Sequence, residues 1–274
     1  MSLQPPPTSV YNVTFPEPGI MLVTINRPAQ MNSIPMSGHL EGQALFEWFD
    51  DEPSLTVAIV TGAGSKAFCA GGDLKQQRDT PYGAEPQQQQ PMAPSGVAGL
   101  SRRIGKKPVI AAVNGFAFGG GAEICLNCDI VIAAKQATFG LPEVLRGLYA
   151  GAGGLSRMVR VCGLQVASEL ALTGRRLSAD EACRLGFVNV VTESVEEMMA
   201  KALSLARQIA GSSPDAIIVT RSGLRESLAC GSVEEASQRT EQRYSRALLT
   251  SENMRIGLEA FAAKKQPKWV ASRL

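Results

Sequence analysis

The hydrophobic pattern of the 274-residue chain alternates between short apolar runs and apolar residues at helical spacing. The run 57–60 (Val-Ala-Ile-Val) contains no polar residue, which is typical of a strand covered on both faces. Leu40, Ala44 and Trp48 recur at helical spacing and predict a helix over residues 37–49. Further strands are predicted at residues 11–15, 20–25, 109–113, 129–134 and 188–191. This alternation of strands and helices predicts the α/β class.

The chain divides into three parts by composition. Residues 1–10 are rich in proline and serine and predict a loose N-terminal arm. Residues 11–200 contain all the predicted strands, and residues 201–274 read as a helical region suited to contact between subunits. Within the core, residues 76–98 hold a run of glutamines with several prolines and predict a mobile loop.

Charge and hydropathy narrow the classes of partner. Hydrophobic residues make up 45% of the chain and charged residues 19%, the balance of an ordinary globular protein. The net charge of +2 predicts neither a nucleic-acid partner nor a membrane partner. No apolar run reaches the roughly 18 residues that a membrane span requires.

The cysteines and the single histidine limit the possible chemistry. The six cysteines are scattered and predict reduced thiols. Cys125 and Cys128 form a C-x-x-C, but no second such pair exists, so core thiols are expected rather than metal ligands. His39 has no nucleophile motif near it and is expected on the surface of the helix over 37–49. Acid–base chemistry must therefore rest on carboxylates, Lys, Tyr or Cys.

The segment 57–64 (Val-Ala-Ile-Val-Thr-Gly-Ala-Gly) looks like the start of a dinucleotide-binding unit. Such a turn must lead into a helix that carries the pyrophosphate. The adjacent glycines Gly71 and Gly72 oppose a helix there, and no tyrosine is followed by a lysine four residues later. The sequence thus argues against a nicotinamide cofactor.

A stronger motif is the segment 117–123 (Ala-Phe-Gly-Gly-Gly-Ala-Glu), between a buried strand and a predicted helix. Its glycines let the backbone approach a ligand, and the free N–H groups of a helix start favour negative charge. The arrangement suits an oxyanion, with the carboxylate of Glu123 one turn into the helix. A tight turn with Glu123 complementing the helix dipole explains the motif equally well.

Two more segments carry the same kind of signal. Residues 67–75 (Ala-Phe-Cys-Ala-Gly-Gly-Asp-Leu-Lys) end a strand with paired glycines and offer a second backbone N–H. In residues 139–143 (Phe-Gly-Leu-Pro-Glu), Pro142 is expected to hold Glu143 in an extended or turn segment, where its carboxylate can point into a pocket. An ordinary surface acid is the alternative for Glu143.

Taken together, these segments resemble the crotonase (enoyl-CoA hydratase/isomerase) family, in family order from about residue 12 onward. The matching segments are 26–28 (Asn-Arg-Pro), 68–74, 107–115 (Lys-Pro-Val-Ile-Ala-Ala-Val-Asn-Gly), 119–123, Asp129, 139–143, 151–154 (Gly-Ala-Gly-Gly) and 172–174 (Leu-Thr-Gly). The resemblance implies a spiral of β-β-α repeats with a C-terminal helical region that builds trimers or dimers of trimers. Residues 145–150 resemble carnitinyl-CoA dehydratase-like members.

The resemblance also implies a site for an acyl-CoA thioester. The N–H groups of Gly72 and Gly120 would form the oxyanion hole, with Glu123 and Glu143 as the acid–base pair. Coenzyme A arrives as part of the substrate, so no cofactor or metal is expected. The implied substrate-binding residues are Gln30, Met31, Ala70, Gly72, Asp73, Leu74, Gly119, Gly120, Pro142 and Gly151, with Phe261 and Lys264 from a neighbouring subunit.

Because the family hydrates, isomerises, dehalogenates or hydrolyses acyl-CoA thioesters, the acid–base set decides the reaction. Both glutamates are present, which favours hydration of a 2-enoyl-CoA, since two carboxyl groups around one water supply a base and an acid. An isomerase and a carnitinyl-CoA dehydratase-like enzyme stay open. So does an RNA-binding or structural homologue, although the basic residues Arg102, Arg103, Lys106 and Lys107 read as a solvated helix end near the CoA phosphates.

The final tripeptide, Ser272-Arg273-Leu274, resembles the Ser-Lys-Leu peroxisomal address, with arginine keeping the positive charge. No Lys or Arg precedes Arg27, so no Arg-rich transit peptide is expected. A peroxisomal location is predicted if the source is eukaryotic, and a cytoplasmic one otherwise.

Overall fold

The computed structural model describes residues 3–78 and 92–274. Most of the predicted loop over 76–98, namely residues 79–91, lies outside this range. The larger of the two sheets has the order β1-β2-β3-β5-β7-β10, with β1 antiparallel to β2 and every other neighbour parallel. Its strands are β1 (Tyr11–Glu17), β2 (Ile20–Ile25), β3 (Val57–Gly62), β5 (Val109–Val113), β7 (Ile130–Ala134) and β10 (Val190–Thr192).

The smaller sheet has the order β4-β6-β8-β9. Its strands are β4 (Ala67–Cys69), β6 (Phe116–Phe118), β8 (Thr138–Gly140) and β9 (Leu177–Ser178). Each pair β3–β4, β5–β6 and β7–β8 places its first strand in the larger sheet and its second in the smaller one. A helical segment follows each pair: α2 (Leu74–Arg78), α3 (Gly120–Asn127), and the 3-10 helix η3 (Pro142–Arg146) with α4 (Gly154–Thr173). The predicted α/β class and the spiral of β-β-α repeats are confirmed.

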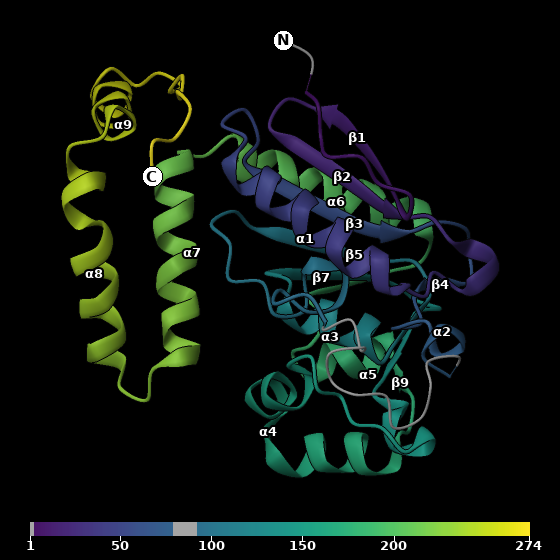
Figure 1. Ribbon diagram of the computed structural model, residues 1–274. Helices are drawn as coiled ribbons and strands as arrows, with labels where there is room; N and C mark the ends of the chain where they lie inside the picture. The colour runs from purple at the N-terminus through teal and green to yellow at the C-terminus, as the bar shows by residue number, and fades with distance from the viewer. Residues whose placement is uncertain (1–2, 79–91) are drawn as a thin grey trace.

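The larger sheet is buried on both faces, as its apolar strands predict. Ala58 and Val60 of β3 face the main core, where they join residues of α1 (Met36–Asp51). Val57 and Ile59 alternate to the opposite face, which α6 (Val195–Ala210) covers. Figure 1 shows the two helices on opposite sides of the sheet. The period of two therefore places each of residues 57–60 in an apolar layer.

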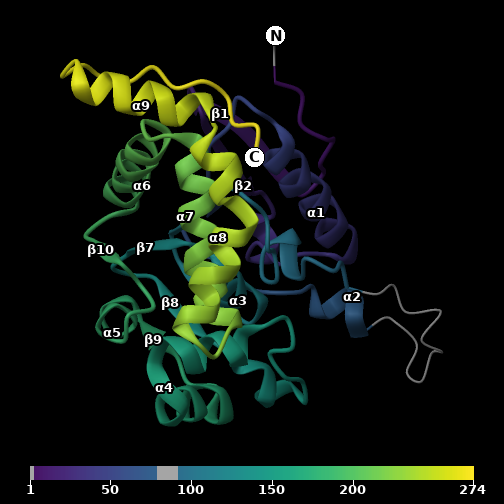
Figure 2. The same cartoon turned by 90° about the vertical axis from the view of Figure 1, so that its left-hand side faces the viewer.

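The C-terminal helices form an arm beside the core. They are α7 (Pro214–Ala229), α8 (Val233–Leu249) and α9 (Glu252–Ala262), and Figures 1 and 2 show them outside the two sheets. The predicted boundary at residue 200 falls inside α6, whose Met198 and Ala202 pack on the larger sheet, so the arm begins at α7. In the described part of the chain, no helix is both long enough and apolar enough to cross a membrane.

Two sequence-based expectations for the N-terminal region need correction. The predicted loose arm is held at its end, because the N–H groups of Ser9 and Val10 donate to the Glu41 carboxylate of α1 (2.8 and 3.1 Å). His39 is buried, not exposed, since the 3-10 helix η2 (Val97–Gly99) packs on α1 and the N–H of Ala98 donates to His39 Nδ1 (3.2 Å). Burial lowers the pKa of His39 to about 4, which keeps the ring neutral.

Candidate active site

Three neighbouring strands of the smaller sheet end at one edge, and each leads into a predicted site segment. The strands β4, β6 and β8 are parallel, with Cys69 opposite Ala117 and Phe118 opposite Gly140. The N–H of Gly119 donates to the carbonyl of Gly140 (2.9 Å), which extends the pairing beyond the strands. Because the carboxyl ends of parallel neighbours meet, the segments that follow them lie side by side.

The first two segments bring the glycine turns into contact. Gly71 has a φ of +91°, and a Cβ on it would lie 3.0 Å from the backbone nitrogen of Gly120. Only glycine combines this conformation with so close an approach. The turn after β4 is thereby placed against the start of α3.

The N–H groups of Gly72 and Gly120 are available for a ligand. The carbonyl of Ile34 accepts a hydrogen bond from the N–H of Asp73, and the N–H of Ile34 donates to the carbonyl of Gly71. Both bonds lie on one side of the segment 71–73, so the N–H of Gly72 points to its other side. Gly120 is the first residue of α3, where a helix leaves its N–H groups without an intrahelical partner. Within residues 3–78 and 92–274, neither N–H has a hydrogen-bond acceptor.

Glu123 lies in the first turn of α3 and is 3% exposed. Its Oε1 accepts a hydrogen bond from the N–H of Gly154 at the start of α4 (2.8 Å). Burial raises its pKa, and hydrogen bonds from the backbone of Gly154 and Ala152 oppose that rise. Glu123 is buried because α4 packs over the first turn of α3.

Glu143 follows β8 and lies in the first turn of η3, with Pro142 at the first position of this 3-10 helix. The segment predicted as extended or turn is a short 3-10 helix that begins at the proline, and Glu143 lies in its first turn, not in a helix interior. A Cβ on Gly119 would lie 3.1 Å from Glu143 Oε1, which places the carboxyl group against the glycine turn of α3. Its Oε2 is buried without a hydrogen-bond partner among the described residues.

The two carboxyl groups belong to one electrostatic site. Burial raises the pKa of Glu143 to about 7, and the charge of Glu123 adds to the rise. Glu123 has backbone donors that stabilise its ionised form, whereas Glu143 Oε2 has none. These surroundings favour the carboxylate at Glu123 and the neutral acid at Glu143.

Five of the implied substrate-binding residues form one group at the carboxyl end of β4: Gln30, Met31, Ala70, Asp73 and Leu74. The N–H of Ala70 donates to the carbonyl of Met31 (3.1 Å), which follows Gln30 at the end of the 3-10 helix η1 (Pro28–Gln30). Asp73 pairs with Arg27 (3.1 Å). Leu74 begins α2 with 49% of its surface exposed.

The other expected contacts are divided between two places. Gly151 lies in the turn before α4, against the ring of Tyr149. Phe261 and Lys264 lie at the end of α9, and Figures 1 and 2 show this helix far from α3. The structure therefore does not bring these two residues to the glutamates of the same chain.

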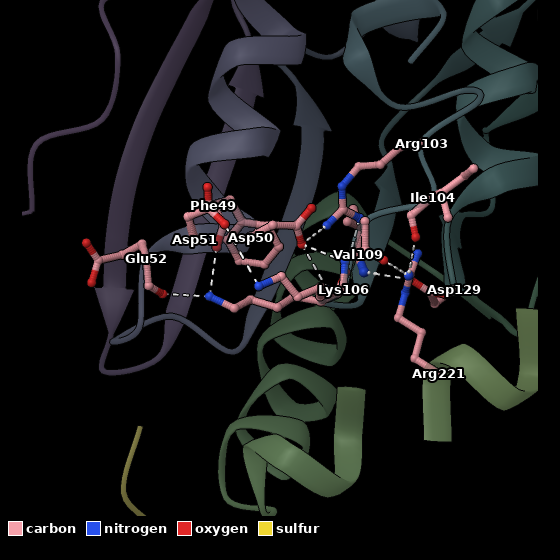
Figure 3. A network of polar contacts seen from close by, with 12 residues as sticks. Phe49, Asp50, Asp51, Glu52, Arg103, Ile104, Lys106, Val109, Asp129 and Arg221 are labelled. Carbon is pink, nitrogen blue, oxygen red and sulfur yellow. Dashed lines mark hydrogen bonds and ion pairs between the residues drawn. The ribbon is translucent and has the colours of Figure 1, made fainter. Parts of the chain in front are cut away.

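Of the four basic residues expected at a solvated helix end, Arg103 and Lys107 are buried, whereas Arg102 is exposed. Figure 3 shows Arg103 beside Asp50. Arg103 pairs with Asp50, and Lys107 Nζ donates to the carbonyls of Phe49 and Glu52 (2.8 and 2.6 Å) at the end of α1. Free carbonyl groups at a helix C-terminus attract cations, which explains why the cluster lies inward. Burial lowers the pKa of Lys107 to about 8.

The same network continues to the arm. Arg221 and Arg225 of α7 both pair with Asp129 (3.0 and 2.7 Å), and Arg225 also donates to the side chain of Asn127 (2.7 Å) at the end of α3. The sequence marked Asp129 as part of the family pattern without giving it a role. Its two arginine partners lie more than 90 residues away, so no local pattern could have identified them.

Comparison with known proteins identifies the family. The model of the enoyl-CoA hydratase/isomerase family matches residues 16–272. A mevalonyl-coenzyme A hydratase of Aspergillus fumigatus is 47% identical over 262 residues, which cover 96% of this chain and 95% of that protein. A carnitinyl-CoA dehydratase of Escherichia coli is 39% identical over 254 residues, covering 91% of this chain and 94% of the relative.

Solved structures agree with the sequence comparison. The crystal structure of an enoyl-CoA hydratase from Bacillus anthracis superposes with a TM-score of 0.85 at 31% identity, covering 96% of this chain and 100% of that one. An enoyl-CoA hydratase from Mycobacterium tuberculosis gives the same TM-score at 33% identity. On sequence and fold together, the chain belongs to the enoyl-CoA hydratase/isomerase (crotonase) family of enzymes.

Proposed function

We propose that this protein is a hydro-lyase that adds water to a 2-enoyl-CoA thioester and removes it in the reverse direction. The observation that carries the proposal is the pair of buried carboxyl groups in unlike surroundings, one bonded to backbone N–H groups and one with a partnerless oxygen. Glu123 lies in the first turn of α3 and Glu143 against Gly119 just before it, at the helix start where the N–H of Gly120 is available; the turn that carries Gly72 packs against the same point through Gly71. A base, an acid and an oxyanion site are thus present together.

The thioester carbonyl would accept hydrogen bonds from the N–H groups of Gly72 and Gly120. As water attacks C3, the carbonyl oxygen gains negative charge, which these fixed donors stabilise without reorganising. One such donor is worth roughly 3 kcal/mol in the transition state. The positive end of the α3 dipole at Gly120 acts in the same direction.

The surroundings of the two glutamates indicate which of them takes a proton and which gives one. Glu123, held as a carboxylate by backbone donors, takes a proton from water while the water oxygen bonds to C3. Glu143, which retains a proton near neutral pH, gives that proton to C2. The site is reset when the proton on Glu123 returns to Glu143, so one water is added and no proton is left over.

The relatives support a short, oxygenated acyl group. The similarity to a mevalonyl-coenzyme A hydratase extends over nearly the whole chain and exceeds that to carnitinyl-CoA dehydratase. We therefore propose the mevalonyl thioester, a 3-hydroxyacyl-CoA in the hydrated state, as the preferred substrate. An isomerase needs only one dominant acid–base group, so the presence of both carboxyl groups favours a hydratase.

The exposed apolar side chains of the C-terminal arm support an oligomeric assembly. Leu224, Val233 and Phe261 on α7, α8 and α9 are 67%, 84% and 85% exposed. Apolar side chains of this size on one appendage favour burial against another copy. We propose a trimer or a dimer of trimers. In this assembly, Phe261 and Lys264 reach the CoA that is bound by a neighbouring subunit. The adenine end of each CoA is lined by five residues of the subunit that binds it: Gln30, Met31, Ala70, Asp73 and Leu74.

The first prediction concerns the substrate. The purified protein should dehydrate mevalonyl-CoA, seen as a gain of the absorbance of the conjugated thioester, with a higher kcat/KM than for hydrating crotonyl-CoA or dehydrating carnitinyl-CoA. A preference for carnitinyl-CoA would overturn the acyl assignment only. Absence of water transfer on every thioester would overturn the hydro-lyase itself.

The second prediction separates the glutamates from ordinary surface acids. Glu123→Gln and Glu143→Gln should each lower kcat by about 10²–10⁴, the scale of general acid–base catalysis. Glu47→Gln on the exposed side of α1 serves as the matched control and should keep wild-type turnover. Retention of near wild-type kcat by either site variant, with its fold intact by circular dichroism, would refute the two-carboxyl mechanism.

The third prediction tests the oxyanion donor. A Cβ on Gly120 would lie 2.9 Å from both Val97 methyl groups, so the test is best made in a Val97→Ala background. There, Gly120→Pro removes the N–H and should lower kcat by about 10²–10³, because one donor is lost. Gly120→Ala in the same background keeps the N–H and should stay within about tenfold of its parent. Equal losses in both variants would show that space, not the donor, matters.

The fourth prediction is the pH dependence of hydration. Since the pKa of Glu143 is raised to about 7, its acid form is present below that pH and lost above it. The kcat/KM for hydration should therefore fall as pH rises through about 7, and that for dehydration should rise. Steady-state profiles in both directions measure this. The fall of kcat/KM for hydration near pH 7 should vanish in Glu143→Gln. If it persists in that variant, another group causes it.

A further inference from the structure

One peptide bond lies between the guanidinium group of Arg157 and the carboxylate of Glu123. Arg157, in the first turn of α4, donates from its Nη1 to the carbonyl of Gly153 (3.2 Å). The N–H of the same peptide group, that of Gly154, donates to Glu123 Oε1 (2.8 Å). A cation on the oxygen of a peptide polarises its N–H, so the two hydrogen bonds strengthen each other.

The glycines of this turn make the arrangement possible. Gly153 has a φ of +101°, and a Cβ there would lie 2.0 Å from Arg157 Nη1. A Cβ on Gly154 would lie 2.7 Å from Glu123 Cγ. The guanidinium and the carboxylate therefore each pack directly against one of the two glycines, and the turn fixes one relative to the other.

The charge of Arg157 remains directed at Glu123. Arg225, which faces Arg157, is paired with Asp129, whereas Arg157 forms no ion pair within the described chain. Arg157 is also half-buried, so water screens its field less than that of the exposed Arg102, the other cation near Glu123.

Among the described neighbours of Glu123, only Glu143 on η3 carries a negative charge that opposes the ionisation of Glu123. From β4 comes the thiol of Cys69, which stays neutral because burial raises its pKa to about 12. The segments β6 and η2, which also pack on α3, carry no ionisable side chain. Arg157 is thus the principal charge favouring ionised Glu123.

We propose that Arg157 is a positioning residue for hydration, which holds the Gly153–Gly154 peptide on Glu123 and keeps that glutamate as the carboxylate base. The inference rests on the proposed function and deepens it, because it explains which of two buried glutamates carries the shared proton. Without the guanidinium, Glu123 would compete with Glu143 for that proton, and fewer molecules would hold the base and the acid in their required forms.

The test compares Arg157→Met, Arg157→Lys and the control Arg160→Met, an exposed arginine on the same helix. In Arg157→Met, the acidic limb of kcat/KM for hydration should move to higher pH by about one unit, the effect of losing a nearby opposite charge. Arg157→Lys keeps the charge, so the acidic limb of kcat/KM should return to its wild-type pH, while kcat stays below that of the wild type. Arg160→Met should match the wild type.

A second measurement does not depend on turnover. Infrared titration of the protonated carboxyl band, assigned with Glu123→Gln, reports the pKa of Glu123 in the substrate-free protein. A higher value in Arg157→Met than in the wild type supports the inference even if the substrate proposal fails. An unchanged value in folded Arg157→Met, or an equal and pH-independent loss of kcat in both Arg157 variants, overturns it.

Discussion

The parallel pairing of β4, β6 and β8 is the constraint on which the site depends. These strands are only three residues long, yet their register brings Gly72, Gly120 and Glu143 to one edge of the smaller sheet. A shift of register by one residue would turn each following segment to the other face of the sheet. The larger sheet, buried on both faces, holds that register because each of the pairs β3–β4, β5–β6 and β7–β8 contributes one strand to each sheet.

The chemistry then follows from unequal burial of two identical side chains. Glu123 and Glu143 both lose water, but only Glu123 gains backbone donors from the turn before α4. Loss of water favours the neutral acid when no hydrogen bonds replace it. Where backbone N–H groups donate to the buried carboxyl group, the ionised form is stabilised. The surroundings of the two glutamates thus favour different protonation states, a pattern typical of paired acids and bases.

Ionic contacts inside the protein connect the catalytic helix to the arm. Asp129, at the end of α3, is bound by Arg221 and Arg225 of α7, while Arg103 and Lys107 bind the end of α1. Removing one member of such a buried set leaves a charge without a partner, which is far more costly than losing a surface pair. The arm is therefore fixed to the C-terminal end of α3, the helix whose first turn carries Glu123.

Local patterns were sufficient for the elements and for the family. The apolar run at 57–60 and the glycine-rich segment at 117–123 predicted a doubly buried strand and a helix start, and both are confirmed. The position of Glu123 in the first helical turn also followed from spacing alone. These features depend on residues a few positions apart, where side-chain period and backbone sterics decide the structure.

What only the tertiary structure decided concerns partners distant in the chain. The sequence placed His39 at the surface and Arg103 with Lys107 in solvent, and all three are buried, because η2, α1 and α7 pack over them. Nothing near Glu123 in the sequence indicated that Gly154 would hold its carboxylate or that Arg157 would lie behind that peptide. Burial and charge are properties of the packed molecule, so a residue's neighbours across the fold, not those along the chain, determine its pKa and hence its chemistry.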